Sequence, residues 1–318
     1  MSETIGTILV FPGQGSQHVG MGKELFEQFD EAKQVFLEAE EVLGLPLRQW
    51  CFSGPEEKLK LTEYTQPAIL TVSVAALRVL EAECGPTPSF VAGHSLGEYS
   101  ALVCVGALHF RDAVKVVRER GRLMQEAVPE GEGMMAAVLG LEAAAVQQLC
   151  DEACEGDVVV PANFNGGGQI VVAGNREAVL RAKSLARDRG AKKVVELPVS
   201  APFHSPLMRS ASEGLRETLE DVAIRPFSVG VISNVEATVN LDPERVKPLL
   251  VEQVVRPVRW EETIKHVAEL GCNRALEVGP GRVLCGLIKR IIPGMETKNV
   301  AAPGDLEKTV ADSSWPWI

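Results

Sequence analysis

A serine with the surroundings of a catalytic nucleophile lies at position 95. The run GHSLG at 93–97 matches the pattern G-x-S-x-G, in which small residues let a strand and a helix approach closely around a sharp turn. The pattern alone is weak evidence for a nucleophile. However, the apolar run at 89–93 predicts a buried strand before it, and a helix-compatible stretch follows. We therefore interpret Ser95 as a nucleophile; an ordinary strand–helix turn with a capping serine is the alternative.

A serine nucleophile needs a base, and the chain has five histidines. His94 precedes Ser95 on a strand that enters a turn, so its side chain should point elsewhere. His109 is typical of a loop residue before a helix, and His266 of a helix surface. His204 follows a strand and comes after the serine in the chain, as in α/β-hydrolases. His204 is therefore the candidate base, and a role outside catalysis stays open.

Arg120 is predicted to face the protein interior. If residues 111–127 form a helix, Arg120 lies at the centre of an apolar stripe, and the other charged residues lie on the opposite side. The stripe consists of Ala113, Val116, Val117, Gly121, Met124 and Ala127. An inward guanidinium cannot lose its charge and needs an anion. That anion would be an internal carboxylate in a structural ion pair, or the carboxylate of a substrate.

The glycine-rich loop FPGQGSQ at 11–17 follows a predicted strand. It lacks G-x-G-x-x-G spacing, and the chain contains no G-x-x-x-x-G-K-[ST] motif, so a nucleotide cradle is not indicated. Such a loop can instead aim a backbone N–H at a site, and an oxyanion hole needs two such donors. The candidates are the N–H groups of Gln14 and Leu96; a tight turn that needs glycine is the alternative.

The elements expected to position these residues alternate between strands and helices, which is the pattern of α/β proteins. Buried strands are predicted at 7–11, 89–93, 229–233 and 274–278. A mostly apolar helix is predicted over 67–83, because Pro67 suits a first helical turn. Residues 128–199 follow the order β-α-β-β-α-β, which is ferredoxin-like. We therefore expect an α/β core formed by 1–127 and 200–318, with 128–199 inserted as a small subdomain.

Composition limits the classes of function. The chain has 318 residues, 46% of them hydrophobic, and a net charge of −11, so it is globular and not suited to nucleic acid as a main ligand. The seven cysteines include no C-x-x-C pair and no zinc-ligand spacing, so we read them as reduced core residues and expect no metal. A signal peptide and a membrane-spanning run are both missing, which favours a cytoplasmic protein.

Taken together, these motifs resemble one family, the malonyl-CoA:acyl carrier protein transacylases of fatty acid synthesis. Matching segments, in the expected order, are FPGQGSQ (11–17), TQPAI (65–69), GHSLGEYSAL (93–102), RGRLMQEA (120–127), SAPFHSPLM (200–208), PVRW (257–260) and EVGPGRVL (277–284). GHSLGE alone is moderately specific, and the ordered set, which spans nearly the whole chain, is highly specific. The resemblance implies an α/β-hydrolase-like core with a ferredoxin-like subdomain and a cleft between them.

The resemblance also implies a role for each site residue. Ser95 would take up the malonyl group, His204 would be its base without a third acid, and Arg120 would grip the free malonyl carboxylate. Gln14 and Leu96 would be the oxyanion donors. No cofactor is implied, since the phosphopantetheine belongs to the carrier protein.

Three further positions follow from the resemblance. Phe203 resembles the Phe-His pairing of malonyl-selective enzymes and should disfavour methylmalonyl, with a plain core role as the alternative. Arg259 stands where some members have Gln, and the family's backbone carbonyl there would orient the histidine. Residues 166–168 are GGG in place of a Ser-Pro-Gly type turn, a change that leaves the catalytic roles intact.

The implied reaction is ping-pong transfer of malonyl from malonyl-CoA to Ser95 and then to the thiol of acyl carrier protein, supplying extender units for fatty acid synthesis. The rivals are a serine esterase or thioesterase, which has no use for Arg120, an acyltransferase that serves a polyketide synthase, and a non-catalytic carrier-binding protein. We also expect a monomer.

Docking of the carrier protein is the remaining question. Acyl carrier proteins are usually acidic, as this chain is, so docking must depend on a local basic patch. The candidates are Arg187, Arg189, Lys192, Lys193, Lys289 and Arg290. A solvated face is the alternative interpretation.

Overall fold

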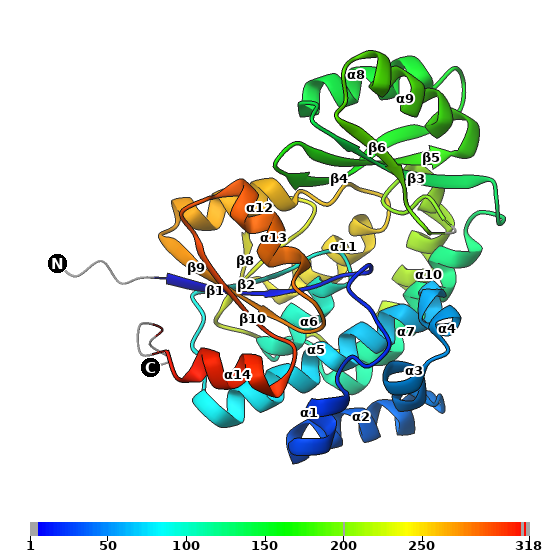
Figure 1. The fold of residues 1–318 in the computed structure, drawn as a ribbon. Helices are drawn as coiled ribbons and strands as arrows, with labels where there is room; N and C mark the ends of the chain where they lie inside the picture. The colour runs from blue at the N-terminus through cyan, green and yellow to red at the C-terminus, as the bar shows by residue number, and fades with distance from the viewer. Residues whose placement is uncertain (1–5, 200, 313–314, 316–318) are drawn as a thin grey trace.

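The computed structural model describes residues 6–199, 201–312 and 315, which form a large lobe and a smaller one (Figure 1). Ser200, the first residue of the SAPFHSPLM segment, lies outside the described residues, as do both ends of the chain. No helix in the described part is both long and apolar enough to cross a membrane.

A six-stranded sheet forms the centre of the large lobe (Figure 1). In spatial order its strands are β10 (Glu296–Val300), β9 (Cys272–Val278), β1 (Gly6–Phe11), β2 (Phe90–Gly93), β7 (Gly230–Ile232) and β8 (Val239–Asn240). All neighbours are parallel except the antiparallel pair β7 and β8. Parallel strands require crossover connections, so helices cover both faces of the sheet.

Successive side chains of β1 point to opposite faces of the sheet, and each face has its own core. Leu9 and Phe11 pack in the larger core, and Ile8 and Val10 in the second. Helices α2 (Asp30–Leu43), α5 (Thr62–Cys84), α6 (Gly97–Cys104), α7 (Phe110–Glu126), α10 (Arg209–Glu220) and α11 (Pro243–Gln253) contribute to the larger core, and α12 (Trp260–Glu269) and α13 (Val283–Ile291) to the second. The shorter elements are α1 (Lys23–Gln28), α3 (Leu47–Ser53), α4 (Glu56–Lys60), the 3-10 helix η1 (Pro206–Met208) and α14 (Pro303–Val310).

Helix α5 begins at Thr62, so the start predicted at Pro67 is wrong. Thr62, Thr65 and Gln66 are all buried. Tertiary packing therefore extends the helix beyond the point that local propensity favours. This extra turn places Gln66 in the interior, where it contacts Arg120.

The small lobe has the predicted β-α-β-β-α-β order. Its elements are β3 (Gly133–Leu139), α8 (Ala143–Ala153), β4 (Val159–Gly166), β5 (Gln169–Asn175), α9 (Arg176–Asp188) and β6 (Lys193–Glu196). The strands form an antiparallel sheet in the order β4-β5-β3-β6, with α8 and α9 packed on one face. Met135 and Ala137, on the other face, join the larger core of the main lobe. The boundaries at 128 and 199 stay a prediction.

Candidate active site

Ser95 lies on a sharp turn between β2 and α6, as the G-x-S-x-G pattern predicts. Its φ of 51° is in the left-handed region, which a residue with a side chain adopts only when its surroundings impose it. A Cβ atom on Gly93 would overlap the backbone of Gly97, and one on Gly97 would overlap the carbonyl of Phe11. Only glycine therefore allows the strand and helix to meet this closely.

Ser95 and His204 form a hydrogen-bonded pair. The distance from Ser95 Oγ to His204 Nε2 is 2.8 Å, and His204 Nδ1 lies 2.7 Å from the backbone oxygen of Gln253. Because a carbonyl oxygen can only accept, Nδ1 carries the hydrogen and Nε2 is left free to accept the serine proton. His204 is buried and, like Ser95, has a positive φ, of 58°.

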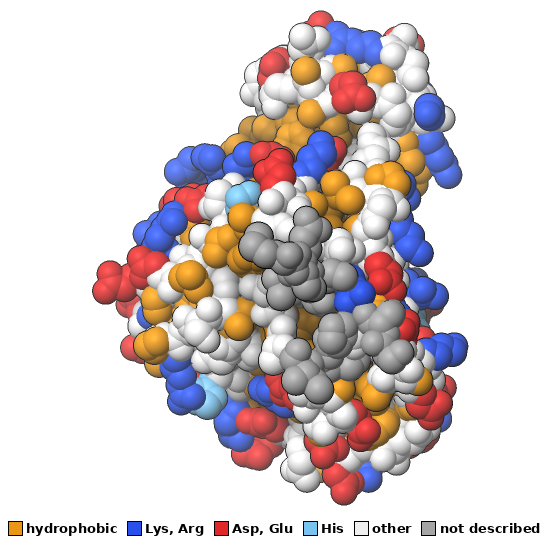
Figure 2. Space-filling model, turned by 90° about the vertical axis from the view of Figure 1, so that its left-hand side faces the viewer, with side chains coloured by type: hydrophobic (Ala, Val, Ile, Leu, Met, Phe, Trp, Pro, Cys, Tyr) orange, Lys and Arg blue, Asp and Glu red, His pale blue; other side chains and the backbone are white. Residues whose placement is uncertain are grey.

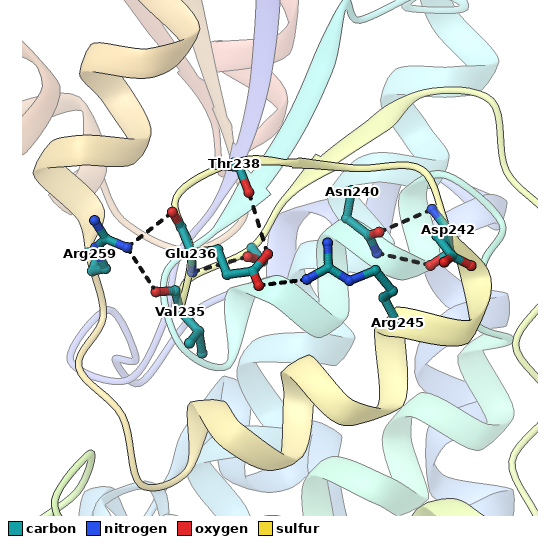
Figure 3. A network of polar contacts seen from close by, with 8 residues as sticks. Val235, Glu236, Thr238, Asn240, Asp242, Arg245 and Arg259 are labelled. Carbon is teal, nitrogen blue, oxygen red and sulfur yellow. Dashed lines mark hydrogen bonds and ion pairs between the residues drawn. The ribbon is translucent and has the colours of Figure 1, made fainter.

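The prediction that the backbone carbonyl of Arg259 orients the histidine is wrong, because the carbonyl of Gln253 does so. Arg259 instead holds the loop after β7. Its guanidinium donates to the carbonyls of Val235 and Glu236, at 3.3 and 3.2 Å (Figure 3). Its backbone N–H donates to the carbonyl of Asn234 at 3.0 Å.

Asn234, which sequence reasoning missed, braces the turn at Ser95. Its side-chain Oδ1 accepts from the backbone N–H of Ser95, and its Nδ2 donates to the carbonyl of Gly93, each at 2.6 Å. The amide therefore replaces the backbone partners that a left-handed residue loses. No sequence motif could identify it, since Asn234 is 139 residues from Ser95.

Arg120 faces the interior, as its place on the apolar stripe of α7 predicts, and is only 1% exposed. The guanidinium donates to Gln66 Oε1 and Gln253 Oε1, both at 2.8 Å, and to Ser95 Oγ at 3.1 Å. Among the described residues it has no carboxylate in an ion pair, so the structural ion pair considered for it is not found there. Its hydrogen-bond acceptors are neutral oxygens, and it also lies over the ring of Tyr99, at 5.6 Å. A buried cation of this kind is suited to bind an anion that arrives from outside.

The residues predicted from the sequence meet in one chamber of about 90 Å³. Its lining includes Gln14, Leu96 and Phe203, in addition to Ser95, His204 and Arg120. Within residues 6–199, 201–312 and 315, the backbone N–H groups of Gln14 and Leu96 donate to no protein acceptor. Both residues line this chamber, and the oxyanion role of their N–H groups stays a prediction.

A larger cleft of about 650 Å³ leads away from the chamber. Gln14, His94, Asn163, Leu197 and Val199 line both spaces, so the chamber is the inner end of the cleft. The lining comes from both lobes, and in Figure 2 the smaller lobe rises above the main body.

His94 points away from Ser95, as expected. Its Nε2 lies 2.8 Å from Asn165 Oδ1 on β4, and its ring packs against Trp260. Burial lowers the pKa of His94, so its ring is neutral and links the core to the small lobe.

The three glycines at 166–168, which follow Asn165 in the chain, all have positive φ, of 82°, 60° and 71°, a conformation that glycine adopts readily.

The described residues contain no group of three or more His, Cys, Asp or Glu that could hold a metal ion. All seven cysteines are free thiols. Ser95, His204 and Arg120 are the side chains of the chamber whose chemistry is considered below.

Comparison with known proteins agrees with this geometry. Residues 8–312 match the family described as acyl transferase domain. The malonyl CoA-acyl carrier protein transacylase of Bacillus subtilis is 49% identical over 302 residues, which are 95% of each chain. The corresponding transacylase structure from Coxiella burnetii has a TM-score of 0.95 at 44% identity, over 97% of this chain and 98% of that one.

One further solved structure contains a partner. It is a malonyl-transacylase in complex with a type II PKS acyl-carrier protein, with a TM-score of 0.94 and 44% identity, over 96% of this chain and 99% of that one. These likenesses confirm the predicted α/β fold with its small antiparallel subdomain. The chain belongs to the malonyl CoA-acyl carrier protein transacylase family of acyl transferases.

Proposed function

We propose that this protein transfers the malonyl group of malonyl-CoA to the phosphopantetheine thiol of an acyl carrier protein, through an ester on Ser95, for fatty acid synthesis. One observation carries the proposal: a Ser–His pair lines the same small chamber as a buried arginine that forms no ion pair with any described carboxylate. The pair supports acyl transfer, and the arginine supports an acyl group that ends in a carboxylate.

The first half-reaction acylates the enzyme. Ser95 Oγ attacks the thioester carbonyl while its proton moves to His204 Nε2. The N–H groups of Gln14 and Leu96 hold the oxyanion of the tetrahedral intermediate. When the intermediate collapses, the C–S bond breaks and His204 returns the proton to the leaving CoA sulfur.

The second half-reaction repeats these steps with a new nucleophile. The thiol of the carrier's phosphopantetheine gives its proton to His204 Nε2 and attacks the malonyl-Ser95 ester. The C–O bond of the ester then breaks, and His204 returns the proton to Ser95 Oγ. Malonyl leaves as a thioester of the carrier protein.

The geometry of the site disfavours the rival function of a serine esterase. Such enzymes orient the histidine with a carboxylate, whereas His204 Nδ1 faces the neutral carbonyl of Gln253. An esterase also has no use for the buried Arg120. A carrier protein of polyketide synthesis is the alternative acceptor, because one relative binds a type II PKS carrier.

Phe203 is proposed to restrict the acyl group. It precedes His204, is 7% exposed and lines the inner chamber. A ring at this place crowds a methyl branch on the α-carbon, so methylmalonyl should react more slowly than malonyl.

Intact-mass measurement tests the proposal. The protein is mixed separately with malonyl-CoA, methylmalonyl-CoA and acetyl-CoA, and any adduct is located by peptide mapping. We expect a malonyl adduct on Ser95 that disappears when holo acyl carrier protein is added, and less adduct from the other two thioesters. Absence of any adduct, or hydrolysis of the adduct as fast without carrier as with it, would overturn the proposal.

The kcat/KM of Ser95 acylation, which reports the protein without bound substrate, should depend little on pH between about pH 8 and about pH 5. Burial, and then the positive charge of Arg120, lower the pKa of His204 from 6.5 to about 3, so its ring stays neutral over this range. Quenched-flow measurement of the acyl adduct at each pH tests this. An acid limb centred near the ordinary histidine pKa would contradict it.

The same pKa shift predicts that stability, unlike the acylation rate, depends on pH. Below the ordinary histidine pKa of 6.5 the unfolded chain binds a proton at His204, and the folded chain does not until about pH 3. The unfolded state therefore binds more protons, and the free energy of unfolding falls as the pH decreases through this window. Circular dichroism at each pH is the control that separates lost fold from lost chemistry.

Docking of the carrier is proposed to use Lys289, near the end of α13. Its neighbour Arg290 lines the cleft and donates to Gln169 on β5 at 3.2 Å, so this end of α13 lies at the cleft mouth. Arg189, by contrast, is paired with Glu152. Acidic and basic side chains are interspersed on the face in Figure 2, so docking depends on a few local cations.

Lys289→Glu should raise the KM for acyl carrier protein by about tenfold and leave acylation by malonyl-CoA unchanged. The rise should shrink at high salt, because surface attraction is screened. Lys23→Glu on α1 carries the same change of charge outside the cleft lining and is the control. The same KM for acyl carrier protein in Lys289→Glu and Lys23→Glu would contradict this docking site.

The monomeric state and the cytoplasmic location of the protein stay predictions.

A further inference from the structure

A buried carboxylate that the proposed reaction does not use lies beneath Ser95. Glu98, in the first turn of α6, is 4% exposed and belongs to no ion pair among the described residues. Its Oε2 accepts from Gln253 Nε2 at 2.6 Å and from the backbone N–H of Asn234 at 3.1 Å. Both partners are neutral, and the charge of Arg120 offsets only part of the cost of burying the carboxylate. Its position therefore calls for an explanation beyond packing.

The first partner, Gln253, connects three groups of the site. Its backbone oxygen accepts from His204, its Oε1 accepts from Arg120 at 2.8 Å, and its Nε2 donates to the Ser95 carbonyl at 3.1 Å. A side-chain amide can bond in two orientations, and Arg120 needs its oxygen. An acceptor at Glu98 holds the amino group on the opposite side and so fixes the orientation that Arg120 needs.

The second partner, Asn234, connects Glu98 to the nucleophile. Its backbone N–H reaches Glu98 while its side chain accepts from the Ser95 N–H. The same loop is held from outside by Arg259, which donates to the carbonyls of Val235 and Glu236 (Figure 3). Glu98 is therefore hydrogen-bonded to Asn234, which supports Ser95. It is also hydrogen-bonded to Gln253, which supports His204 and Arg120.

We infer that Glu98 is a positioning residue whose buried oxygen, acting through Gln253 and Asn234, keeps Ser95, His204 and Arg120 in their reactive arrangement. The inference rests on the proposed function. It assigns Glu98 no contact with substrate. What it requires is an acceptor atom at the place of Oε2, and not a negative charge.

Two observations support an acceptor without a charge. Both hydrogen bonds end on the same atom, Oε2, so an amide oxygen placed there would receive both. Burial raises the pKa of Glu98 to about 7, against the smaller effects of its hydrogen bonds and of Arg120, so a neutral group is readily accommodated.

Three variants separate the position of the acceptor from its charge. Glu98→Gln keeps an oxygen at the same place and loses the charge, Glu98→Asp keeps the charge and withdraws the oxygen by one methylene, and Glu98→Met keeps the volume without an acceptor. Each is assayed by single-turnover acylation over a range of concentrations of malonyl-CoA and of acetyl-CoA, per folded molecule. The maximal rate and the half-saturating concentration, called KM below, are obtained for each thioester.

We expect Glu98→Gln to stay within about threefold of the unsubstituted protein, and the other two to lose about 30- to 100-fold in the acylation rate, since a displacement of about 1 Å in a reacting group has an effect of this size. The KM for malonyl-CoA should also rise in the Asp and Met variants and that for acetyl-CoA should not, because only malonyl needs Arg120. Glu98→Asp and Glu98→Gln are both polar substitutions, so the comparison survives if the Met variant does not fold.

The opposite order, with Asp active and Gln inactive, would overturn the inference, as would equal activity in all three variants. A loss that is the same for both thioesters at unchanged KM would also overturn it. Glu40→Gln is the control, because Glu40 also accepts from a backbone N–H and a side chain, both of Arg48, away from the site. Glu40→Gln should lower the stability of the protein and leave the acylation rate and the KM unchanged. If the unsubstituted protein forms no acyl adduct, the proposed function fails first.

Discussion

His204→Ala is expected to slow acylation of Ser95 by about 1000-fold. The Ser95 hydroxyl is a weak nucleophile on its own, and His204 Nε2, at 2.8 Å, is the acceptor that its proton reaches. No carboxylate lies behind the ring to share the task, since Nδ1 bonds to the Gln253 carbonyl. Removing the ring therefore removes all general-base assistance while the oxyanion donors remain.

The measurement is the rate of acyl-adduct formation by quenched flow and mass spectrometry. Ser95→Ala should form no adduct, because its hydroxyl oxygen is the atom that is acylated. His266→Ala is the matched control, since His266 lies on α12 and only approaches Glu269 there. A rate in His204→Ala within tenfold of the unsubstituted protein would contradict the assigned base.

The parts of the site that the sequence predicted are those with a local signature. The turn at Ser95 follows from glycines spaced along a strand and helix, and the burial of Arg120 follows from helical periodicity. The order of elements in the small lobe follows from alternating apolar runs. Each of these three predictions depends only on residues in the same helix or strand or in the next one along the chain.

The parts that the sequence did not predict depend on contacts between distant segments. The acceptor for His204 is a backbone oxygen, which every residue has, so its type could not identify Gln253 and the prediction fell on Arg259. Asn234 and Glu98 are ordinary polar residues until the fold places them beneath Ser95. The early start of α5 likewise depends on tertiary burial of Gln66, which bonds to Arg120.

Arg120→Ala is expected to reverse the preference of the enzyme from malonyl to uncharged acyl groups. A bidentate pair between a buried guanidinium and a carboxylate is worth about 3 kcal/mol when one partner is removed. Malonyl transfer should therefore fall by more than about 100-fold in kcat/KM. Acetyl transfer has no carboxylate to lose and should stay within about threefold or increase.

An increase for acetyl would have its own physical cause. Arg120 is the charged group that most lowers the pKa of His204, after burial, and its loss makes the imidazolium of the transition state less unfavourable. In the unsubstituted protein the malonyl carboxylate offsets that charge itself, and acetyl cannot. Malonyl is therefore favoured twice, once by binding and once by the stronger base that it creates.

Competition between malonyl-CoA and acetyl-CoA, read as the ratio of the two adducts on Ser95, measures the preference directly. Arg118→Ala is the matched control on the same helix, because Arg118 pairs with Glu63 and is partly exposed. Its adduct ratio should equal that of the unsubstituted protein. Near-normal malonyl transfer in folded Arg120→Ala would show that the carboxylate is held elsewhere. A parallel loss of both transfers would show that Arg120 supports Ser95, which it contacts at 3.1 Å, and not the substrate.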